Sequence, residues 1–392
     1  DGAGRGLGEA LRAPDHASGP LSLEALAGIL HHAGGITAVR GGQRLRAAPS
    51  SGGLFPTEIY LAVEEVGELG PGLYHYDAEA HQLERLAGTV ESLGVPHLPP
   101  TPVSFVLTLM LRRTSYKYGH RAYRYAVADA GHLLENLRIA AAEAGLHANP
   151  VAQFDEGRVA AAFGVDGVEE GVVALVPLSS TAPPALSPYH GPAPTPADES
   201  KSLGVSALVH AATSLRLATA AGEGRTAPLP PPTLAPGGQA AEGALAVIRA
   251  RRSERRYRDE PVGLDALSTL LADSAQPPLL STAIRIHVVA RRVDGLAAGV
   301  HRYHPGAHGL ELVRPGDRAA EARAAALAQE LIADAAALIV LSADRGQVVA
   351  RDGARGYRHA LLETGMIGER LLLGAVAQGL GACPVGAFYD DE

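Results

Sequence analysis

The 392-residue chain is too long for one ordinary hydrophobic core and fits two domains. With 46% apolar and 19% charged residues it has the composition of a soluble globular protein, and no apolar run approaches the ~18 residues of a membrane span. The net charge of −8 argues against nucleic acid as a partner, because phosphate binding needs clustered Lys and Arg. The single cysteine, Cys383, excludes an internal disulfide and any multi-cysteine metal site, and it fits a reducing cytoplasm.

The first part of the chain predicts a mixture of helices and strands. Apolar residues recur every three or four positions at Leu23, Leu26, Ile29 and Leu30, which predicts an amphipathic helix. The next predicted elements are a strand at 58–64, a hairpin at 72–86, a second strand at 104–111 and a long helix at 127–144. The long helix is rich in Ala and Leu, and Gly145 fits its C-terminal end.

A stretch rich in Pro, Ala and Gly follows, at roughly 181–243. It includes Pro228-Leu229-Pro230-Pro231-Pro232, which is typical of a linker between domains. A helical pattern at 205–220 predicts one short helix inside this linker, packed on one of the domains.

The last part of the chain predicts the same order of elements again. The first is a helix through Leu264 to Leu271. A strand at 285–290, a hairpin at 299–313 and a second strand at 336–342 follow it. The last is a long helix at 360–378, which Gly379 ends. Because hairpins join the strands, we expect an α+β fold rather than a doubly wound parallel sheet. The expected domains are 1–180 and 244–392, joined by the linker 181–243.

The two parts are repeats of one another. Residues 123–156 match 357–390 without a gap, at an offset of 234. The identical residues include, in pairs, Tyr123 and Tyr357, Gly131 and Gly365, Glu135 and Glu369, and Pro150 and Pro384. Shorter matches at offsets of 227 and 241 relate 72–86 to 299–313 and 20–30 to 261–271. A domain-sized period indicates a duplicated domain rather than a solenoid. His81 and His308 recur at one hairpin position, which indicates a structural role.

Three segments carry residues suited to chemistry or binding. The first is 251–256, where Arg251, Arg252, Ser253 and Arg255 could hold a phosphate through charge-assisted hydrogen bonds. The alternative is a solvated basic turn.

The second segment is the loop 46–56, with Pro49, Ser50, Ser51, Gly52 and Gly53 at its centre. Small residues and glycines allow backbone N–H groups to approach a ligand closely, and prolines stiffen the two ends. The alternative is an ordinary loop before the strand at 58–64.

The third segment contains Lys117 and Tyr118, ahead of the helix at 127–144. A neighbouring ammonium group favours the ionised form of a phenol, so the pair could transfer a proton. The alternative is a surface loop with one packed aromatic ring.

Together these segments resemble the SagB-type dehydrogenases of the nitroreductase superfamily. The resemblance rests on 46–61, 72–77, 117–132, 251–257 and 379–388, in that order. It implies two tandem nitroreductase-like domains that form an intrachain pseudo-dimer and bind FMN at their interface. It also implies that the Arg and Ser cluster of one half holds the FMN phosphate, and that the Pro-Ser-Ser loop of the other half reaches the flavin ring. Gly381, Pro384 and Gly386 are implied as further cofactor contacts.

The sequence departs from a symmetric pair in a complementary way. Opposite 251–253, the first half has Ala10-Leu11-Arg12, so it lacks the phosphate cluster. Opposite 49–53, the second half has 276–280, Gln-Pro-Pro-Leu-Leu, so it lacks the ring loop. The Lys-Tyr pair is also present only in the first half. We therefore expect one FMN in the chain.

The activity that the resemblance implies is oxidation of thiazoline or oxazoline rings in a ribosomally made peptide to thiazoles or oxazoles. Lys117 and Tyr118 would move the proton while FMN takes the hydride, and oxygen would reoxidise the flavin. Two alternatives stay open: an NAD(P)H-dependent nitro or ene reductase, and a non-catalytic scaffold that binds a peptide or a biosynthetic complex. The expected partners are an azoline-containing peptide and a cyclodehydratase complex, without nucleic acid or membrane, and further oligomerisation stays open.

Overall fold

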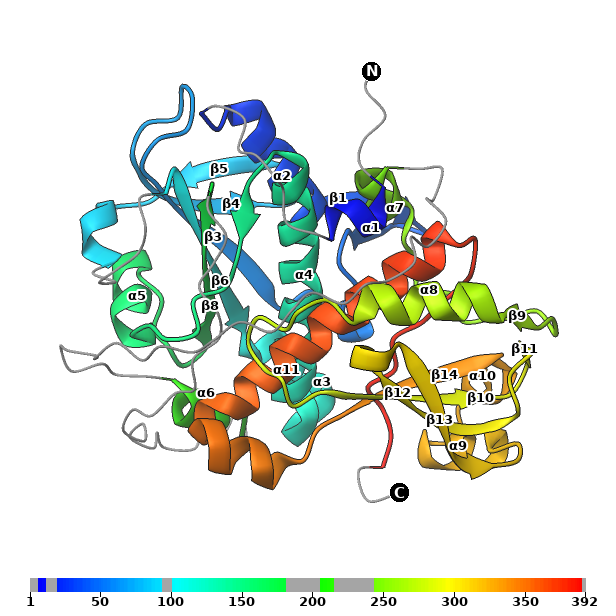
Figure 1. The fold of residues 1–392 in the computed structure, drawn as a ribbon. Coiled ribbons are helices and arrows are strands. Elements are labelled where there is room, and N and C mark those ends of the chain that lie inside the picture. The colour runs from blue at the N-terminus through cyan, green and yellow to red at the C-terminus, as the bar shows by residue number, and fades with distance from the viewer. Residues whose placement is uncertain (1–5, 12–19, 94–100, 181–204, 215–242, 390–392) are drawn as a thin grey trace.

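The computed structural model describes residues 6–11, 20–93, 101–180, 205–214 and 243–389. Two antiparallel sheets lie on either side of a pair of crossing helices (Figure 1). The expected α+β class is confirmed. Most of the predicted linker 181–243 lies outside the described residues, but its described part contains helix α6 (Val205–Thr213).

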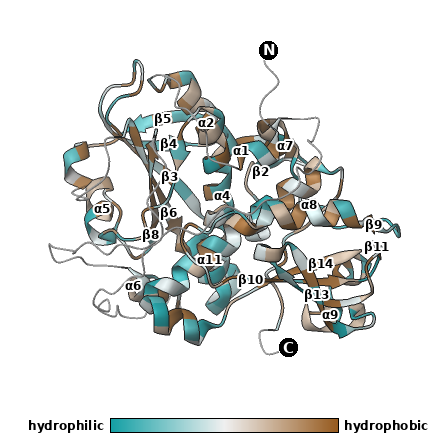
Figure 2. Ribbon diagram, viewed as in Figure 1, coloured by the Kyte–Doolittle hydropathy of each residue, from teal (hydrophilic) through white to brown (hydrophobic). Residues whose placement is uncertain are grey.

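The first half is built on a six-stranded sheet in the order β5-β4-β3-β6-β8-β7. Its antiparallel strands are β3 (Thr57–Val63), β4 (Gly72–Asp77), β5 (Gln82–Arg85), β6 (Val103–Met110), β7 (His147–Ala148) and β8 (Glu170–Ser179). Helices α2 (Leu23–Gly34) and α4 (Ala122–Glu143) cover one face, and α5 (Glu156–Phe163) covers the other. Because both faces are covered, β6 is hydrophobic along nearly its whole length rather than alternating (Figure 2).

The second half is built on a four-stranded sheet in the order β13-β12-β10-β14. Its strands are β10 (Arg285–Ala290), β12 (Gly299–His304), β13 (Gly309–Pro315) and β14 (Ala337–Ser342). Helices α8 (Leu264–Ser274) and α11 (Arg345–Ala377) pack on this sheet, with Leu267, Leu271 and Ile367 in contact with Ile286 and Val288. The predicted strands and hairpins of both halves are thus found within a few residues of their expected positions.

Several described elements have no counterpart in the sequence predictions. They are β7, β8 and α5 of the first half, together with α1 (Leu7–Ala10), α3 (Leu111–Tyr118), α7 (Ala244–Ala250), α9 (Ala319–Ala325), α10 (Glu330–Asp334), β1 (Ile36–Arg40), β2 (Gln43–Arg46), β9 (Val262–Gly263) and β11 (Val293–Asp294). In addition, α4 and α11 begin earlier than predicted. Gly353, with a φ of 67°, kinks α11 at the position where Gly119, with a φ of 51°, separates α3 from α4. The single helix α11 therefore corresponds to α3 and α4 together.

The two long helices cross at equivalent residues of the repeat. A Cβ atom added to Gly131 would lie 2.8 Å from the Cα atom of Gly365, and one added to Gly365 would lie 2.8 Å from the Cα atom of Gly131. Contact between a residue and its own equivalent marks a twofold axis. The two halves are therefore related as the subunits of a dimer are, with the axis close to this crossing.

The hairpins confirm the repeat at atomic detail. Tyr76 and His81 are joined by a hydrogen bond of 2.8 Å, and so are Tyr303 and His308. Both histidines adopt a positive φ, 52° for His81 and 42° for His308. The recurring histidine therefore closes a tight hairpin in each half, as expected of a structural residue.

Candidate functional site

The residues singled out from the sequence gather at the interface between the halves. A Cβ atom added to Gly52 would lie 2.5 Å from the Tyr118 hydroxyl and 2.6 Å from Lys117 Nζ, so the loop touches the Lys-Tyr pair. From the other half, Arg251 Nε donates a hydrogen bond of 3.0 Å to the carbonyl of Ala47. The loop, the pair and the Arg cluster, which are far apart in sequence, thus form one site.

A buried carboxylate fixes the shape of the loop. Asp129 on α4 accepts hydrogen bonds from Ser50 Oγ (2.8 Å), Ser51 N (2.9 Å) and Ser51 Oγ (3.0 Å). Both hydroxyls are therefore turned toward the helix rather than outward. Gly52 and Gly53, with φ values of 65° and 67°, form the outer turn of the loop, which a side chain would strain.

Asp129 was not recognised from the sequence. Burial raises the pKa of its carboxyl to about 6, and the hydrogen bonds from Ser51 and Ser50 only partly offset this effect. Its equivalent in the repeat is Glu363, whose Oε2 accepts hydrogen bonds from the amides of Leu279 (3.0 Å) and Leu280 (2.9 Å). An acidic residue at the same place in both long helices was the signal that could have identified it.

The Arg cluster is built into the interface rather than into a solvated turn. Arg251 is only 4% exposed, and its Nε also lies 3.8 Å from Glu369. Its Nη1 is buried and has no hydrogen-bond partner among the described residues, and the same holds for Arg252 Nε. Buried N–H groups without a partner are rare and unfavourable, so these donors are suited to an anionic oxygen. Arg255, in contrast, is exposed.

The C-terminal segment of the second half completes the site. Ser253 is bridged to Ala382, and Glu254 N donates to the Ala382 carbonyl at 2.9 Å. Gly386 accepts a hydrogen bond of 2.8 Å from the hydroxyl of Tyr125, a residue that the sequence predictions missed.

A contact between rings links this segment to the Lys-Tyr pair. The ring of Tyr125 packs edge-on against that of Tyr118, at 5.0 Å between centroids. Gly381 packs on Glu254, whereas Pro384 is exposed at the edge.

Lys117 and Tyr118 lie in the last turn of helix α3, so the alternative interpretation of this segment as a surface loop is wrong. Lys117 is exposed and Tyr118 is partly buried. The ammonium nitrogen of Lys117 lies 5.4 Å from the centre of the Tyr118 ring. A phenol with a cation beside it, open to solvent on one side, is suited to proton transfer.

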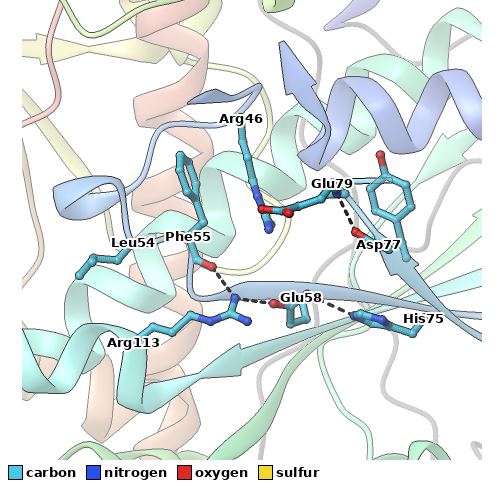
Figure 3. Close-up of a pocket in the computed structure, with 10 residues that line it drawn as sticks. Arg46, Leu54, Phe55, Glu58, His75, Asp77, Glu79 and Arg113 are labelled. Carbon is cyan, nitrogen blue, oxygen red and sulfur yellow. Dashed lines mark hydrogen bonds and ion pairs between the residues drawn. The ribbon is translucent and has the colours of Figure 1, made fainter. Parts of the chain in front are cut away.

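A cavity of about 390 Å³ lies on the other side of Phe55 from the loop (Figure 3). It is lined by residues of β2, β3, β4 and α3, among them Arg46, Glu58, His75 and Arg113. Arg46 belongs to the loop 46–56 singled out from the sequence, whereas Glu58, His75 and Arg113 were assigned no individual role.

The equivalent positions of the second half carry different groups. Arg351 and Asp352 stand where Lys117 and Tyr118 stand in the first half, and they pair with each other, with 2.9 Å between Arg351 Nε and Asp352 Oδ1. Opposite Arg251 and Arg252, the first half has Ala10 and Leu11, which are buried in an apolar cluster.

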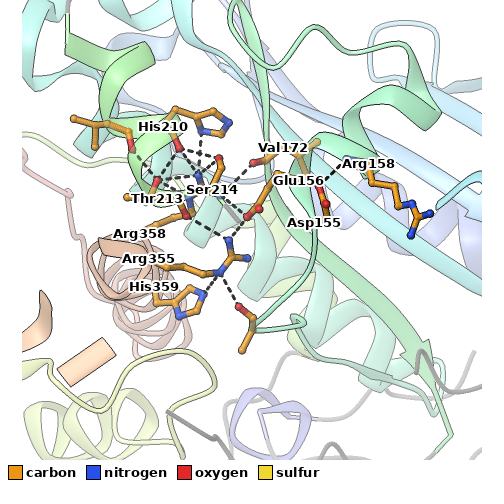
Figure 4. A network of polar contacts seen from close by, with 12 residues as sticks. Asp155, Glu156, Arg158, Val172, His210, Thr213, Ser214, Arg355, Arg358 and His359 are labelled. Atoms are coloured by element: carbon orange, nitrogen blue, oxygen red, sulfur yellow. Dashed lines mark hydrogen bonds and ion pairs between the residues drawn. The ribbon is translucent and has the colours of Figure 1, made fainter. Parts of the chain in front are cut away.

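Further along α11, two buried arginines are fully engaged (Figure 4). Arg355 and Arg358 both donate to Glu156 of α5, and Arg358 also bonds the carbonyl of His210 on α6 at 2.8 Å. Burial, with Arg358 nearby, keeps the pKa of His210 well below its usual value, so His210 is neutral in this cluster. Side chains from the first half and from the linker thus pack against the second half at this place.

Sequence comparison identifies the family. Residues 17–178 and 248–392 both match the sequence profile of the nitroreductase family. The chain belongs to the nitroreductase family. Each matched stretch corresponds to one half of the structure, so two nitroreductase domains form a pseudo-dimer within one chain.

Individual relatives agree with this assignment. The crystal structure of a candidate nitroreductase from Anabaena variabilis has a TM-score of 0.82 and 27% identity, covering 94% of this chain and 83% of that one. MJ1384 of Methanocaldococcus jannaschii, named as a candidate nitroreductase, is 29% identical over 37% of this chain and 75% of its own length. The microcin B17-processing protein McbC of Escherichia coli is 28% identical over 31% of this chain and 49% of its own length. This nitroreductase-family chain thus matches about half of McbC.

Two further findings concern the described part of the nitroreductase-family chain. None of its helices combines the length and apolar character needed to cross a bilayer. No group of three or more His, Cys, Asp or Glu side chains is placed to bind a metal ion in these same residues.

Proposed function

We propose that this nitroreductase-family chain is an FMN-dependent dehydrogenase that oxidises thiazoline or oxazoline rings of a ribosomally made peptide to thiazoles or oxazoles. The observation that carries the proposal is the meeting of the loop 49–53, Lys117 and Tyr118 with the cluster at Arg251. The partial similarity to a microcin B17-processing protein supports a peptide as the substrate.

The residues at the interface fit FMN. The unpartnered Nη1 of Arg251 and Nε of Arg252 are donors of the kind that a phosphate group accepts, and Ser253 adds a hydroxyl. The backbone of Gly52 is exposed and free of a side chain, so a planar ring can lie against it. When bound, FMN would supply the acceptor for the hydride that leaves the substrate ring.

The chain's own residues would then handle the proton. The oxygen of Tyr118, in its ionised form, would accept the proton that leaves the substrate ring at the carbon next to the one that gives up hydride, and Tyr118 would become the neutral phenol. Lys117 places a positive charge beside this acceptor, and the edge-on contact with Tyr125 holds the Tyr118 ring. Loss of the proton and hydride makes the heterocycle aromatic, which favours the reaction.

The test is a single-turnover reaction without oxygen. The flavin-loaded protein is mixed with a synthetic peptide that carries one thiazoline. We expect the flavin absorbance to bleach and the peptide to lose two hydrogen atoms by mass spectrometry. Rapid bleaching by NAD(P)H without any change in the peptide would instead identify a reductase. A protein that cannot be loaded with FMN would identify a scaffold.

A further inference from the structure

The cavity beside Phe55 has no part in the function proposed so far. Its volume of about 390 Å³ lies within the range of ~300–1,000 Å³ for small-ligand sites. Its walls come from the end of β2, the segment after the loop, the start of β3, the end of β4 and helix α3. It therefore includes both ends of the loop 46–56 but none of the central residues 49–53.

The cavity carries charges of both signs. Arg113 and His75 both bond Glu58 on its floor, with 3.2 Å between His75 Nε2 and Glu58 Oε2. Burial opposes ionisation of Glu58, but the hydrogen bonds from His75 and Arg113 outweigh it and hold its pKa below the usual value. Asp77 and Glu79 add two more carboxylates near the rim. With two arginines, Arg46 and Arg113, against three carboxylates, the lining has no excess of positive charge for a phosphate or another strongly anionic ligand.

Arg46 is the group that faces the cavity with the most donor capacity. Its guanidinium lies 5.3 Å from the ring centre of Phe55 and makes one long hydrogen bond, 3.4 Å, to the Thr57 carbonyl. Figure 3 shows this guanidinium and the carboxylate of Glu79 facing the same space. Donors and acceptors side by side match the alternating C=O and N–H groups of a peptide main chain.

Phe55 joins the cavity to the candidate site. Its φ of 44° is uncommon for a residue with a side chain. Ser50 Oγ accepts from its N–H at 2.8 Å on the loop side, and Arg113 donates to its carbonyl at 2.9 Å on the cavity side. Strained backbone held from both sides is typical of ligand-binding sites.

The charge pattern of this lining differs between the two halves. The equivalents of Glu58 and His75 in the second half are Arg285 and Arg302, which occupy the same strand positions. The equivalent of Arg113 is Gln347. The cavity residues are therefore present in the half that also has the loop 49–53 and the Lys-Tyr pair.

We propose that this cavity binds a short segment of the substrate peptide next to the ring that is oxidised, through its main-chain groups. The proposal rests on the proposed function for the identity of the substrate. Arg46 donates to a peptide carbonyl, the rim carboxylates accept from amides, and Phe55 separates the bound segment from the loop.

The test measures binding without turnover. The probe is a fluorescent hexapeptide with one internal thiazole, the aromatic product that cannot be oxidised again. Its dissociation constant is measured by anisotropy with flavin-loaded wild-type protein and with Arg46→Met and His75→Ala. We expect at least about fivefold weaker binding in each variant. Arg46→Met loses roughly one hydrogen bond to the peptide, and His75→Ala removes the side chain that lines the cavity and bonds Glu58. Arg302→Ala, at the equivalent strand position of the second half, is the matched control and should bind as the wild type does.

Equal affinity for the peptide in all four proteins overturns the proposal. The proposal is also overturned if NADPH displaces the peptide and the affinity for NADPH falls in the same variants. His75→Ala keeps the test valid if Arg46→Met disturbs the loop. If the variants weaken peptide binding but no thiazoline is oxidised, the proposed function fails and the peptide site stands. If thiazoline is oxidised and the variants bind normally, the peptide site fails and the proposed function stands.

Discussion

In the proposed mechanism, the oxygen of the Tyr118 side chain accepts the proton. Replacing Tyr118 by Phe keeps the ring packed on Tyr125 and removes only this hydroxyl. We expect thiazoline oxidation to slow by about 10²–10⁴-fold, the usual effect of losing a general base, with FMN still bound. Single-turnover bleaching of the flavin measures the rate. Tyr116→Phe makes the same change at a residue that is 72% exposed, two positions away, and should leave the rate unchanged. Wild-type turnover in Tyr118→Phe would remove this residue from the mechanism.

The carboxyl of Asp129 should leave a signature in the pH dependence of stability. Because burial raises its pKa to about 6, the folded protein holds this proton more tightly than the unfolded chain, whose aspartates titrate near ~3.9. The free energy of unfolding should therefore fall as pH rises from about 4 to about 6, by up to about 3 kcal/mol.

Asp129→Asn removes this ionisation, so the variant should gain stability relative to the wild type between pH 4 and pH 7. Midpoints of guanidinium unfolding at the two pH values measure the change. A difference between the two proteins that is the same at both pH values would show that Asp129 titrates normally.

Local motifs singled out Lys117, Tyr118 and Arg251 as candidate site residues, because each lies in a compact cluster of unusual residues. Asp129 has no such cluster, since its partners Ser50 and Ser51 lie 79 and 78 positions away in the sequence. A contact of this kind depends on the tertiary fold. The only sequence trace is the acid at the equivalent position, Glu363, which becomes meaningful once the repeat is aligned.

Among the elements, periodicity predicted α2, α8, the strands of the four-stranded sheet, and β3, β4, β5 and β6 of the six-stranded sheet, because each presents an apolar face to a core. Strands β7 and β8 of that sheet were not predicted. Helix α3 was missed because most of Leu111–Tyr118 is polar, so it lacks an apolar period. The start of α11 was missed for the same reason, and Gly353 at its kink is a residue that usually ends helices.

The crossing of α4 and α11 makes a clear prediction. Alanine normally stabilises a helix relative to glycine by up to about 1 kcal/mol. At Gly131, however, the added Cβ would lie 2.3 Å from the carbonyl oxygen of Leu362, a backbone atom that cannot move aside cheaply. We expect Gly131→Ala to destabilise the protein by about 1–3 kcal/mol, the usual effect of overpacking.

Thermal or denaturant unfolding of Gly131→Ala measures this effect. Gly28→Ala in α2 is the control, because its added Cβ meets nothing within 4 Å. The control should be neutral or slightly stabilising. If both variants behave alike, the close approach of α4 and α11 is wrong.

For the whole molecule, we expect one FMN per chain. The interface site that contains Arg251 and the loop 49–53 has both the phosphate cluster and the ring loop. The equivalent site has the apolar Ala10 and Leu11 in place of the arginines. Flavin released from the reconstituted protein by denaturation, measured by absorbance against protein concentration, gives the ratio. Arg251→Ala with Arg252→Ala should weaken retention by tenfold or more, as loss of about 1.5–3 kcal/mol per charge-assisted bond implies.

Arg258→Ala, a change at a side chain that is 84% exposed, is the matched control for this double variant. It should retain flavin as the wild type does. A ratio near two flavins per chain would show that the second place also binds FMN.

The twofold relation between the halves has a consequence for how such a chain can change. When identical subunits associate, each substitution occurs at both interface sites, so neither can be altered alone. Covalent fusion removes this restriction, because a residue and its equivalent in the other half can then change independently. Glu156 could come to bond Arg358 in one part of the interface while Lys117 and Tyr118 were kept in the other part. Fusion also keeps the partner at a fixed high effective concentration. Separate subunits lose their shared sites on dilution, whereas here the concentration of the protein has no influence on whether the two halves meet.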